Sequence, residues 1–256
     1  MAKLQDRQTT KRSRHSSAIP LATERSSLLL PGTTPNGSKL TGSRAHSTQG
    51  PRVGGGASQR IATRPDFVGG DYVCADVESI RDLAPMLGRL NARYGVFAVQ
   101  GNYDCLHQPD LIRAQLAAQS IDVLVNRGLH VGPSAGRLFL AGLDSVWRGA
   151  PDPIQAFADY REGDIALALV LEPDYFPTLV RLTPVDVQLS GHRHGGQVRI
   201  PALGPVILPP WGRIYHTGLY ELDGHFVYTG RGLGMVELPL RFNCPPELTD
   251  IILHAA

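Results

Sequence analysis

The sequence predicts an α/β fold, and three observations support this prediction. Short apolar runs that are typical of buried strands alternate with segments in which apolar residues recur at helical spacing. Several of the apolar runs end in polar turns that contain glycine. The chain has 256 residues, of which 42% are apolar, so it can bury a sizeable core. Together these features favour an α/β sandwich.

The first half of the folded region is predicted to alternate strands with helices. Residues 65–68 form a short apolar strand that ends in a glycine turn, and residues 96–99 form a second strand. Between them a helix begins near Asp76 and ends before Tyr94, because apolar residues recur there at helical spacing. The residues on its apolar face are Ile80, Leu83, Leu87 and Leu90. A second helix is predicted over 110–118.

The second half of the chain is predicted to be richer in strands. The extended runs are centred on residue 123 and cover 138–142, 165–171 and 185–189. Beyond Gly195 the pattern changes to short strands separated by proline and glycine. These strands are predicted over 197–200, 226–229, 234–238 and 249–254. Their spacing favours mostly antiparallel pairing, which would form a second sheet.

Residues 1–60 differ in composition from the remainder, so two regions are predicted. They hold ten Lys and Arg against two acidic residues, a net charge of +8, which leaves −6 for the rest of the chain. Their one short apolar run covers 28–30, too little apolar surface to offset the entropy of ordering. The prediction is a basic, disordered, low-complexity tail over 1–60 and a folded domain over 61–256. No aromatic residue is interleaved with the charges, so a solvated tail is favoured over a nucleic-acid-binding arm.

Cysteine usage and hydropathy narrow the class of protein further. Cys74, Cys105 and Cys244 are neither paired by spacing nor arranged as a thiolate metal site, which favours a reducing compartment. No apolar run approaches the roughly 18 residues of a membrane span, and the N-terminus lacks the apolar segment of a signal peptide. These features predict a cytoplasmic protein without a membrane-spanning helix.

Three polar motifs follow predicted strands and offer metal ligands: Gly70-Asp71, Gly101-Asn102-Tyr103-Asp104 and Gly191-His192-Arg193-His194. In an extended segment, His192 and His194 would project to the same side of the backbone. A carboxylate, an amide oxygen and two imidazoles suit Mn, Fe or Zn better than Ca. The candidate ligands are therefore Asp71, Asn102, His192 and His194. Taken alone, Asp71 or Asn102 is more often a turn or helix-cap residue, and only the combination favours a metal site.

At these motifs the sequence resembles the calcineurin-like metallophosphoesterases, whose blocks read GD, GNHD and GHxH. The resemblance implies a four-layer α/β/β/α sandwich and two divalent cations, Mn, Fe or Zn. It also implies hydrolysis of a phosphodiester or pyrophosphate by a hydroxide that bridges the metals, which lie about 3.5–4 Å apart. Tyr103 and Asp104 occupy the positions of the family's catalytic His-Asp pair.

Two further runs are similar to a bacterial branch related to membrane-associated phosphodiesterases: HGGQ at 194–197 and RFNCPPE at 241–247. Some members of that branch hydrolyse UDP-2,3-diacylglucosamine, a precursor in lipid A biosynthesis. The resemblance therefore implies a lipid-linked or nucleotide-sugar phosphoester as substrate. It leaves peripheral association with the inner membrane open and implies no nucleic-acid partner.

The sequence departs from the family pattern at three places. The family's first strand carries a DxH motif, but Asp6 is the only aspartate before Asp66. Leu171 stands where the family usually has a metal-binding histidine, and Tyr103 stands where it has the histidine of GNHD. Either the chain is a degenerate relative, or residues 1–60 are not the native start. The alternative function is a catalytically impaired member that binds a phosphorylated ligand or a partner.

Overall fold

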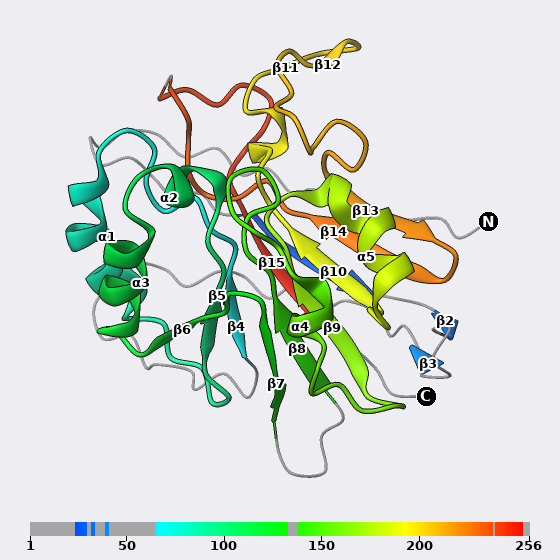
Figure 1. Ribbon diagram of the computed structural model, residues 1–256. Coiled ribbons are helices and arrows are strands. Elements are labelled where there is room, and N and C mark those ends of the chain that lie inside the picture. The colour runs from blue at the N-terminus through cyan, green and yellow to red at the C-terminus, as the bar shows by residue number, and fades with distance from the viewer. Residues whose placement is uncertain are drawn as a thin grey trace, which may run out of the picture.

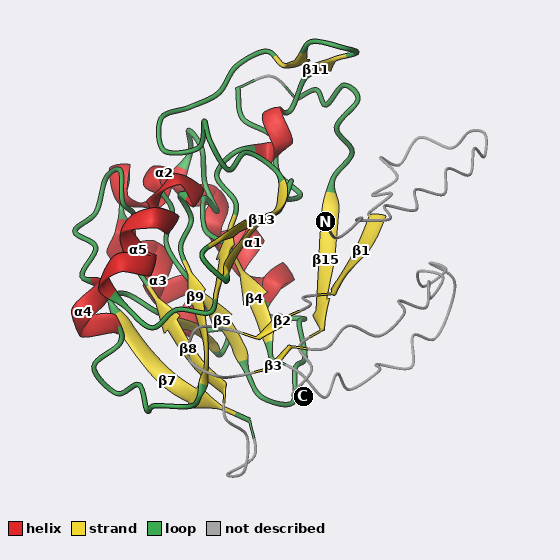
Figure 2. Cartoon of the chain, turned by 90° about the vertical axis from the view of Figure 1, so that its right-hand side faces the viewer, coloured by secondary structure: helices red, strands yellow, loops and turns green. Residues whose placement is uncertain are grey.

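The computed structural model describes residues 24–29, 32–33, 39–40, 65–132, 138–237 and 239–252 (Figure 1). Within the region predicted as a tail it describes three strands, β1 (Glu24–Leu29), β2 (Gly32–Thr33) and β3 (Lys39–Leu40). β2 and β3 pair with each other, and β1 pairs in parallel with β15 (Glu247–Ile252), as Figure 2 shows. The rest of that region lies outside the described residues, so the disordered tail stays a prediction.

The first half of the folded region forms a parallel three-stranded sheet with helices on one face. Its strands are β4 (Asp66–Val68), β5 (Val96–Ala98) and β6 (Ile121–Val123), in that order. The 3-10 helix η1 (Val77–Ser79) leads into α1 (Ile80–Leu87), and α3 (Pro109–Ala117) follows β5. Both helices pack against the sheet through one core cluster. The predicted strand-helix alternation is confirmed here, although Leu90 lies beyond the end of α1 and is exposed.

The second half forms a six-stranded mixed sheet in the order β13-β14-β10-β9-β8-β7. Its four inner strands run parallel, and the two edge strands are antiparallel to their neighbours. The strands are β7 (Arg127–Val131), β8 (Leu138–Gly142), β9 (Ile165–Leu169), β10 (Val187–Ser190), β13 (Gly218–Leu222) and β14 (His225–Thr229). Near one face of this sheet lie α4 (Pro153–Ala156), the 3-10 helix η2 (Pro173–Tyr175) and α5 (Phe176–Leu182).

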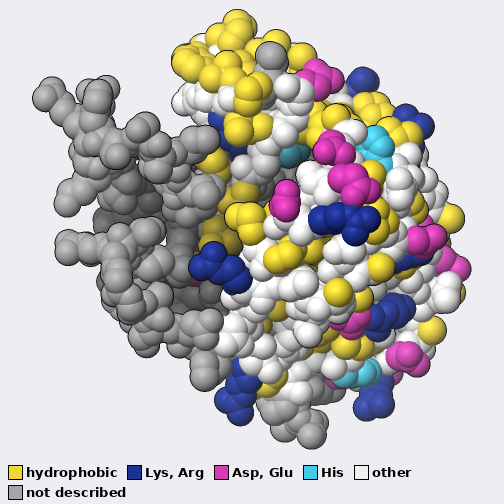
Figure 3. Space-filling model, turned by 90° about the vertical axis from the view of Figure 1, so that its left-hand side faces the viewer, with side chains coloured by type: hydrophobic (Ala, Val, Ile, Leu, Met, Phe, Trp, Pro, Cys, Tyr) yellow, Lys and Arg dark blue, Asp and Glu magenta, His cyan; other side chains and the backbone are white. Residues whose placement is uncertain are grey.

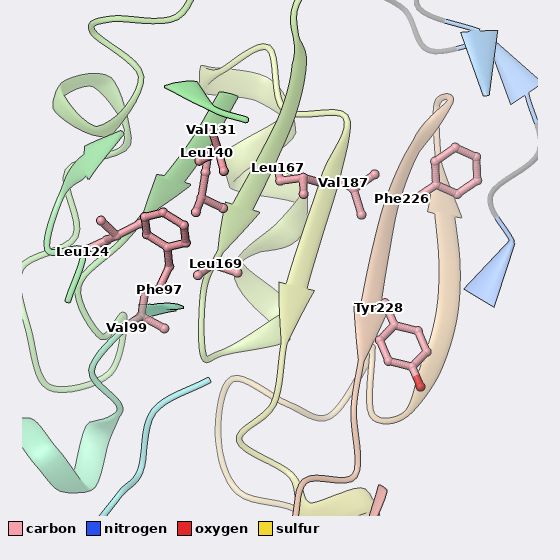
Figure 4. Packing of buried hydrophobic residues seen from close by; sticks show 10 residues of the cluster. All are labelled: Phe97, Val99, Leu124, Val131, Leu140, Leu167, Leu169, Val187, Phe226 and Tyr228. Atoms are coloured by element: carbon pink, nitrogen blue, oxygen red, sulfur yellow. The ribbon is translucent and has the colours of Figure 1, made fainter. Parts of the chain in front are cut away.

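Alternation along the strands divides the core into three layers of side chains. On β8, Leu140 belongs to the cluster between the two sheets, whereas Phe139 belongs to the cluster that includes residues of α4 and α5. On β5, Phe97 faces the six-stranded sheet, whereas Ala98 faces α1 and α3. Figure 4 shows the central layer, where Phe97 lies across from Leu169. The result is the α/β/β/α order of layers that the sequence predicts.

Part of the strand prediction beyond Gly195 is wrong. The strand predicted over 226–229 is β14, and it joins no separate sheet, because it pairs in parallel with β10 and extends the six-stranded sheet. The strand predicted over 249–254 corresponds to β15, which pairs in parallel and not antiparallel. Residues 234–237 form no strand, and Leu238 lies outside the described residues. β11 (Arg199–Ile200) and β12 (Gly204–Pro205) form a short antiparallel hairpin apart from both large sheets. Among the described helices, none has the length and apolar character needed to cross a bilayer.

Candidate metal centre

The three polar motifs lie after the carboxyl ends of β4, β5 and β10. Gly70-Asp71 follows β4 in a loop, and Asn102 begins the short helix α2 (Asn102–Leu106) after β5. The motif with two histidines follows β10 and runs into the 3-10 helix η3 (His194–Gly196). Carboxyl ends of strands in open α/β sheets are where ligands usually bind. The placement of the motifs thus agrees with a functional site.

Asp71 and the motif after β5 are held in direct contact. Oδ1 of Asp71 accepts a hydrogen bond from the backbone N–H of Tyr103 at 3.0 Å. A Cβ atom on Gly101 would stand 2.1 Å from the same oxygen, so only glycine lets the two loops approach this closely. Gly70 adopts a φ of 95°, and a Cβ there would meet the backbone of Gly101 at 2.8 Å. Both glycines therefore permit the approach of Asp71 to the N-terminus of α2.

The carboxylate of Asp104 joins these two loops by accepting hydrogen bonds from the backbone of both. Its side chain is fully buried. Its carboxylate accepts backbone hydrogen bonds from Gly101 and Asp71, both at 2.8 Å, from Tyr72 at 2.9 Å and from Val73 at 3.4 Å. Burial raises the pKa of Asp104 to about 6, although the backbone donors act in the opposite direction. Its oxygens are engaged by the backbone, so the geometry favours positioning of the loops as its role.

Asp71 and Asn102, the candidate ligands after β4 and β5, carry polar groups that the protein alone does not fully compensate. Burial, together with the negative charges of Asp104 and Glu172, raises the pKa of Asp71 to about 8, although the hydrogen bond from the backbone N–H of Tyr103 acts in the opposite direction. Oδ1 of Asn102 is buried and has no hydrogen-bond partner among the described residues. An unpaired buried oxygen costs about 1–3 kcal/mol. A cation bound at this point would compensate both groups.

The two histidines do not lie in an extended segment, so this part of the sequence-based interpretation is wrong. β10 ends at Ser190, and His192 and His194 have φ values of 69° and 47°, in the left-handed region. Gly195 and Gly196 also have positive φ, so the chain coils tightly instead of continuing as a strand. The alternation of a strand therefore does not set the directions of the two rings.

Each histidine is nevertheless held as a metal-binding histidine usually is. Nε2 of His192 lies 2.8 Å from the carbonyl oxygen of Pro210, and Nδ1 of His194 lies 3.0 Å from that of Gly234. A carbonyl can only accept, so the His192 ring donates through Nε2 and leaves its other nitrogen free. Nδ1 of His194 also lies 3.4 Å from the Arg241 guanidinium, which can only donate, so its two neighbours ask opposite roles of this nitrogen. For His192 the other nitrogen is Nδ1, which is buried without a partner among the described residues. Burial lowers the pKa of both rings and favours the neutral form that binds metals.

Sequence reasoning missed the contacts that support the His192 loop. The carboxylate of Glu172, which is fully buried, accepts hydrogen bonds from the hydroxyl of Ser145 and the backbone N–H of Val146 and Trp147. The Trp147 ring then stands edge-on to His192, with ring centroids 5.8 Å apart. The signal in the sequence was an acidic residue inside an apolar stretch. Because Glu172 follows Leu171, the sequence alone leaves open whether its carboxylate replaces the family's histidine as a metal ligand. In the structure this carboxylate is directed at the 145–147 loop, which argues against that role.

Leu171 and Tyr103 occupy the positions where the sequence departs from the family pattern. Leu171 is buried, its carbonyl accepts the N–H of Gly191 at 3.1 Å, and its side chain lies next to Gly191. It thus lies at the base of the His192 loop and offers no ligand there. Tyr103 is partly buried, and burial raises the pKa of its hydroxyl. The hydroxyl is therefore a neutral hydrogen-bond donor.

The candidate ligands form two halves, and the structure does not join them into one cluster. Asp71 and Asn102 lie together, and His192 and His194 share the loop after β10. Within the described part of the chain, no group of three or more His, Cys, Asp or Glu side chains is placed to hold a metal ion. Oδ1 of Asn102 and Nδ1 of His192 still fit metal binding. Buried polar atoms normally have a hydrogen-bond partner, and these two have none among the described residues.

An open cavity of about 400 Å³ borders α2. Its lining includes Gln100, Cys105, Arg113, Asp144 and Arg148. The Arg148 guanidinium lies over the Trp147 ring, 5.2 Å from its centroid. Two guanidinium groups line this cavity; that of Arg113 pairs with Asp110, and that of Arg148 would suit an anionic part of a substrate. Asp144 lines this cavity, and its carboxylate also accepts the backbone N–H of Ser145.

Arg193 lies between the two histidines but packs away from them, against Gly212. Its side chain is buried, and none of its guanidinium nitrogens has a hydrogen-bond partner among the described residues. Burial lowers its pKa to about 10, while the negative charge of Asp174 acts in the opposite direction. The Asp174 carboxylate is itself occupied by the backbone N–H groups of 213–215. Arg193 is thus a buried charge with weak compensation.

The Arg193→Met variant is expected to raise the free energy of unfolding by about 1–3 kcal/mol, because it removes the desolvation penalty and keeps the packing. Urea unfolding would measure the change. Arg213→Met is the matched control, because it removes the same charge from an exposed side chain and should change stability by less than about 0.5 kcal/mol. A loss of stability in Arg193→Met would show instead that the guanidinium is compensated.

The four layers and the polar loops at the strand ends define an α/β sandwich of the metallophosphoesterase type. No model of a protein family matches the chain. The chain is 36% identical over 175 residues to the uncharacterized metallophosphoesterase YkuE of Bacillus subtilis, covering 67% of this chain and 60% of that protein. It is 32% identical over 200 residues to the phosphodiesterase YaeI of Escherichia coli, covering 75% and 72%. The chain belongs to the calcineurin-like metallophosphoesterase family.

More distant relatives include a transmembrane protein with a metallophosphoesterase domain from Bos taurus, 24% identical over 204 residues. That match covers 73% of this chain and 45% of the bovine protein. The chain thus spans less than two thirds of the Bacillus subtilis relative and less than half of the bovine one.

Proposed function

We propose that this chain is a divalent-metal-dependent phosphoesterase that hydrolyses a phosphodiester or pyrophosphate bond. Family membership supports the reaction class. The observation that carries the metal dependence is the pair of unpaired buried atoms, Oδ1 of Asn102 and Nδ1 of His192. An amide oxygen and an imidazole nitrogen are ligand types that Mn, Fe and Zn accept.

In this proposal Asp71, Asn102, His192 and His194 hold the cations. When bound, the cations would polarise the phosphate ester and lower the pKa of water at the site. The contact of His192 Nε2 with the Pro210 carbonyl leaves Nδ1 of that ring available for this purpose. Asp104 contributes indirectly, because it holds the backbone of Asp71 and Gly101 in place.

Tyr103 is proposed to act as a hydrogen-bond donor to the substrate. Its neighbour along α2 is Asn102, and burial keeps its hydroxyl protonated by raising its pKa. A protonated hydroxyl can donate to a phosphate oxygen but gives up its proton reluctantly at neutral pH. Tyr103 would therefore bind and orient the phosphate more effectively than it would protonate a leaving group.

The proposed substrate class is a lipid-linked or nucleotide-sugar phosphoester, of which the lipid A precursor UDP-2,3-diacylglucosamine is one example. The 194–197 and 241–247 runs support this class by resemblance. The cavity beside α2 supports it further, since Arg148 lines it and would bind a second anionic group of the substrate. A cytoplasmic location and the absence of a nucleic-acid partner belong to the same proposal.

Metal content measured together with phosphodiesterase activity tests the proposed function. The full chain is prepared with added Mn and Zn, and its metal content and its hydrolysis of bis(p-nitrophenyl) phosphate are measured. About two metal ions per chain are expected. His192→Ala should lose most of the metal and the activity, because it removes a proposed ligand.

The matched control for this experiment is His130→Ala. It removes a histidine that lies on β7 and pairs with Asp164, remote from the candidate ligands in the sheet order. This variant should keep both the metal and the activity. A wild-type chain that binds no metal and has no turnover would contradict the proposal and favour the alternative of a phosphorylated-ligand-binding protein.

A further inference from the structure

The guanidinium of Arg241 lies where several backbone carbonyl groups converge. It donates hydrogen bonds of 2.5–3.4 Å to the carbonyl oxygens of His194, Arg231, Gly232, Gly234 and Cys244. A guanidinium carries its N–H groups in one plane, so a single side chain can serve carbonyls that approach from several directions. Arg241 thereby joins the loop after β10, the 231–234 loop after β14 and the segment that leads into β15.

Converging carbonyl oxygens repel one another, and the positive charge of Arg241 compensates them. The Glu247 carboxylate, whose charge acts on Arg241, pairs with Arg231 at 3.0 Å. The sequence neighbours Leu240 and Phe242 are apolar and exposed. Figure 3 shows hydrophobic side chains gathered at the top of the molecule, where Figure 1 places β11 and β12. Arg241 is thus a cation in an apolar segment that is directed at backbone groups.

The backbone of His194 depends on these contacts because it is strained. Its φ of 47° lies in the left-handed region, which a residue with a Cβ atom keeps only where its surroundings hold it. The His194 carbonyl accepts from Nη1 of Arg241 at 3.1 Å and from the thiol of Cys244 at 3.2 Å. A Cβ atom on Gly195, the next residue, would stand 2.6 Å from both Cys244 Sγ and Arg231 Cγ. The turn at 194–195 is therefore packed tightly from both sides.

The same guanidinium sets the group that contacts the His194 ring. Nδ1 of His194 lies 3.0 Å from the Gly234 carbonyl oxygen and 3.4 Å from Nη2 of Arg241. Nε and Nη2 of Arg241 both donate to that carbonyl, at 3.1 Å and 2.5 Å, and so fix its position. The shorter of the two distances from Nδ1 favours an Nδ1–H that donates to Gly234. In that tautomer Nε2 carries the lone pair that a cation requires.

We propose that Arg241 is a positioning residue of the candidate metal centre, which holds the Gly234 carbonyl against His194 so that the ring presents Nε2 to a cation. Arg241 acts through His194 and is not itself a ligand. The inference rests on the proposed function in so far as His194 is taken as a metal ligand. The tautomer of His194 in the metal-free chain does not depend on that function, so it can be tested separately.

Nitrogen-15 NMR of the full chain, labelled in its histidine rings, measures this tautomer without metal at about pH 8, where imidazole is neutral. The His194→Ala variant identifies the signals of His194 by their loss. The wild type is expected to carry the proton on Nδ1. Arg241→Met, which keeps much of the packing but no donor, should show both tautomers. A wild-type proton on Nε2, or the same tautomer in both chains, would overturn the proposal.

Calorimetric titration with Zn measures the effect on the metal centre. Arg241→Met should weaken Zn binding by about 10–100-fold, the usual effect of removing a group that orients a ligand. The same change made in the His194→Ala variant should cause no further loss, because Arg241 acts through that ring. Equal losses in the two backgrounds would overturn the proposal. A wild-type chain that binds no Zn would contradict the proposed function, and the tautomer would still decide the role of Arg241.

Two control variants separate positioning from a general loss of charge or stability. Arg127→Met removes an arginine on β7 that pairs with Asp122, at the far edge of the six-stranded sheet from β14. Phe139→Leu lowers stability in the core cluster near α4 and α5. Both should keep the tautomer and the Zn affinity of the wild type, and thermal unfolding shows how far each is destabilised. A loss of affinity in Phe139→Leu as large as that in Arg241→Met would overturn the proposal.

Discussion

Replacing Asp104 with alanine is expected to lower the free energy of unfolding by about 3–5 kcal/mol. The carboxylate accepts four backbone hydrogen bonds, from Gly101 and from the three consecutive residues 71–73. Alanine would leave these N–H groups without an acceptor at a buried position. The loops that carry Asp71 and Asn102 would then lose the group that holds them together.

Urea unfolding followed by circular dichroism measures this effect. The loss of stability in Asp104→Asn should lie between that of Asp104→Ala and zero. The amide keeps one acceptor oxygen, but its NH₂ group replaces the other oxygen and faces backbone N–H groups that are also donors. Asp110→Ala serves as the control, since that carboxylate is 88% exposed, pairs with Arg113 and should cost less than about 0.5 kcal/mol. Equal effects of the Asp104→Ala and Asp110→Ala variants would contradict the positioning role.

The sequence predicts the layered core well because side-chain alternation is a local property. Leu167 and Leu169 alternate with Ala166 and Ala168 along β9, and the structure places the two pairs on opposite faces of the sheet. The helical spacing marks the packed face of α1 only in part: Ile80 and Leu87 pack on the first sheet as predicted, whereas the buried Ala84 was not predicted. These patterns can be read over a few residues without knowing the rest of the fold.

Features that depend on distant contacts could not be predicted in this way. The pairing of β14 with β10 joins segments far apart in sequence, so spacing alone favoured a separate sheet. The left-handed conformations of His192 and His194 are unusual for residues other than glycine, and a local pattern gave no sign of them. In the candidate site, the sequence identified the ligand types at the strand ends. It did not show how Glu172 holds Trp147 against His192.

The Leu171→His variant is expected to increase the affinity of the chain for Mn or Zn by at least about tenfold, equivalent to about 1.4 kcal/mol. Leu171 lies at the base of the His192 loop, where its carbonyl accepts the N–H of Gly191. An imidazole there would add a nitrogen ligand beside the unpaired Nδ1 of His192. The same substitution should raise phosphodiesterase activity if the proposed function is correct.

Without metal, the Leu171→His variant should be less stable than the wild type by about 1–3 kcal/mol, because a polar ring replaces a buried leucine. Added metal should reverse this loss, since a ligand that binds only the folded state stabilises it. Isothermal titration with Zn and thermal unfolding with and without Zn measure the two effects. The opposite signs expected with and without metal distinguish a new ligand from a simple packing defect.

The double variant Leu171→His with His192→Ala tests whether both side chains serve the same cation. If they do, removing His192 should abolish most of the gain in affinity, because the two ligands act as one coupled unit. Independent effects would place the new histidine at a separate site. A Leu171→His variant that is destabilised and binds metal no better than the wild type would show that this position does not face the centre. The missing histidine would then not explain the incomplete ligand set.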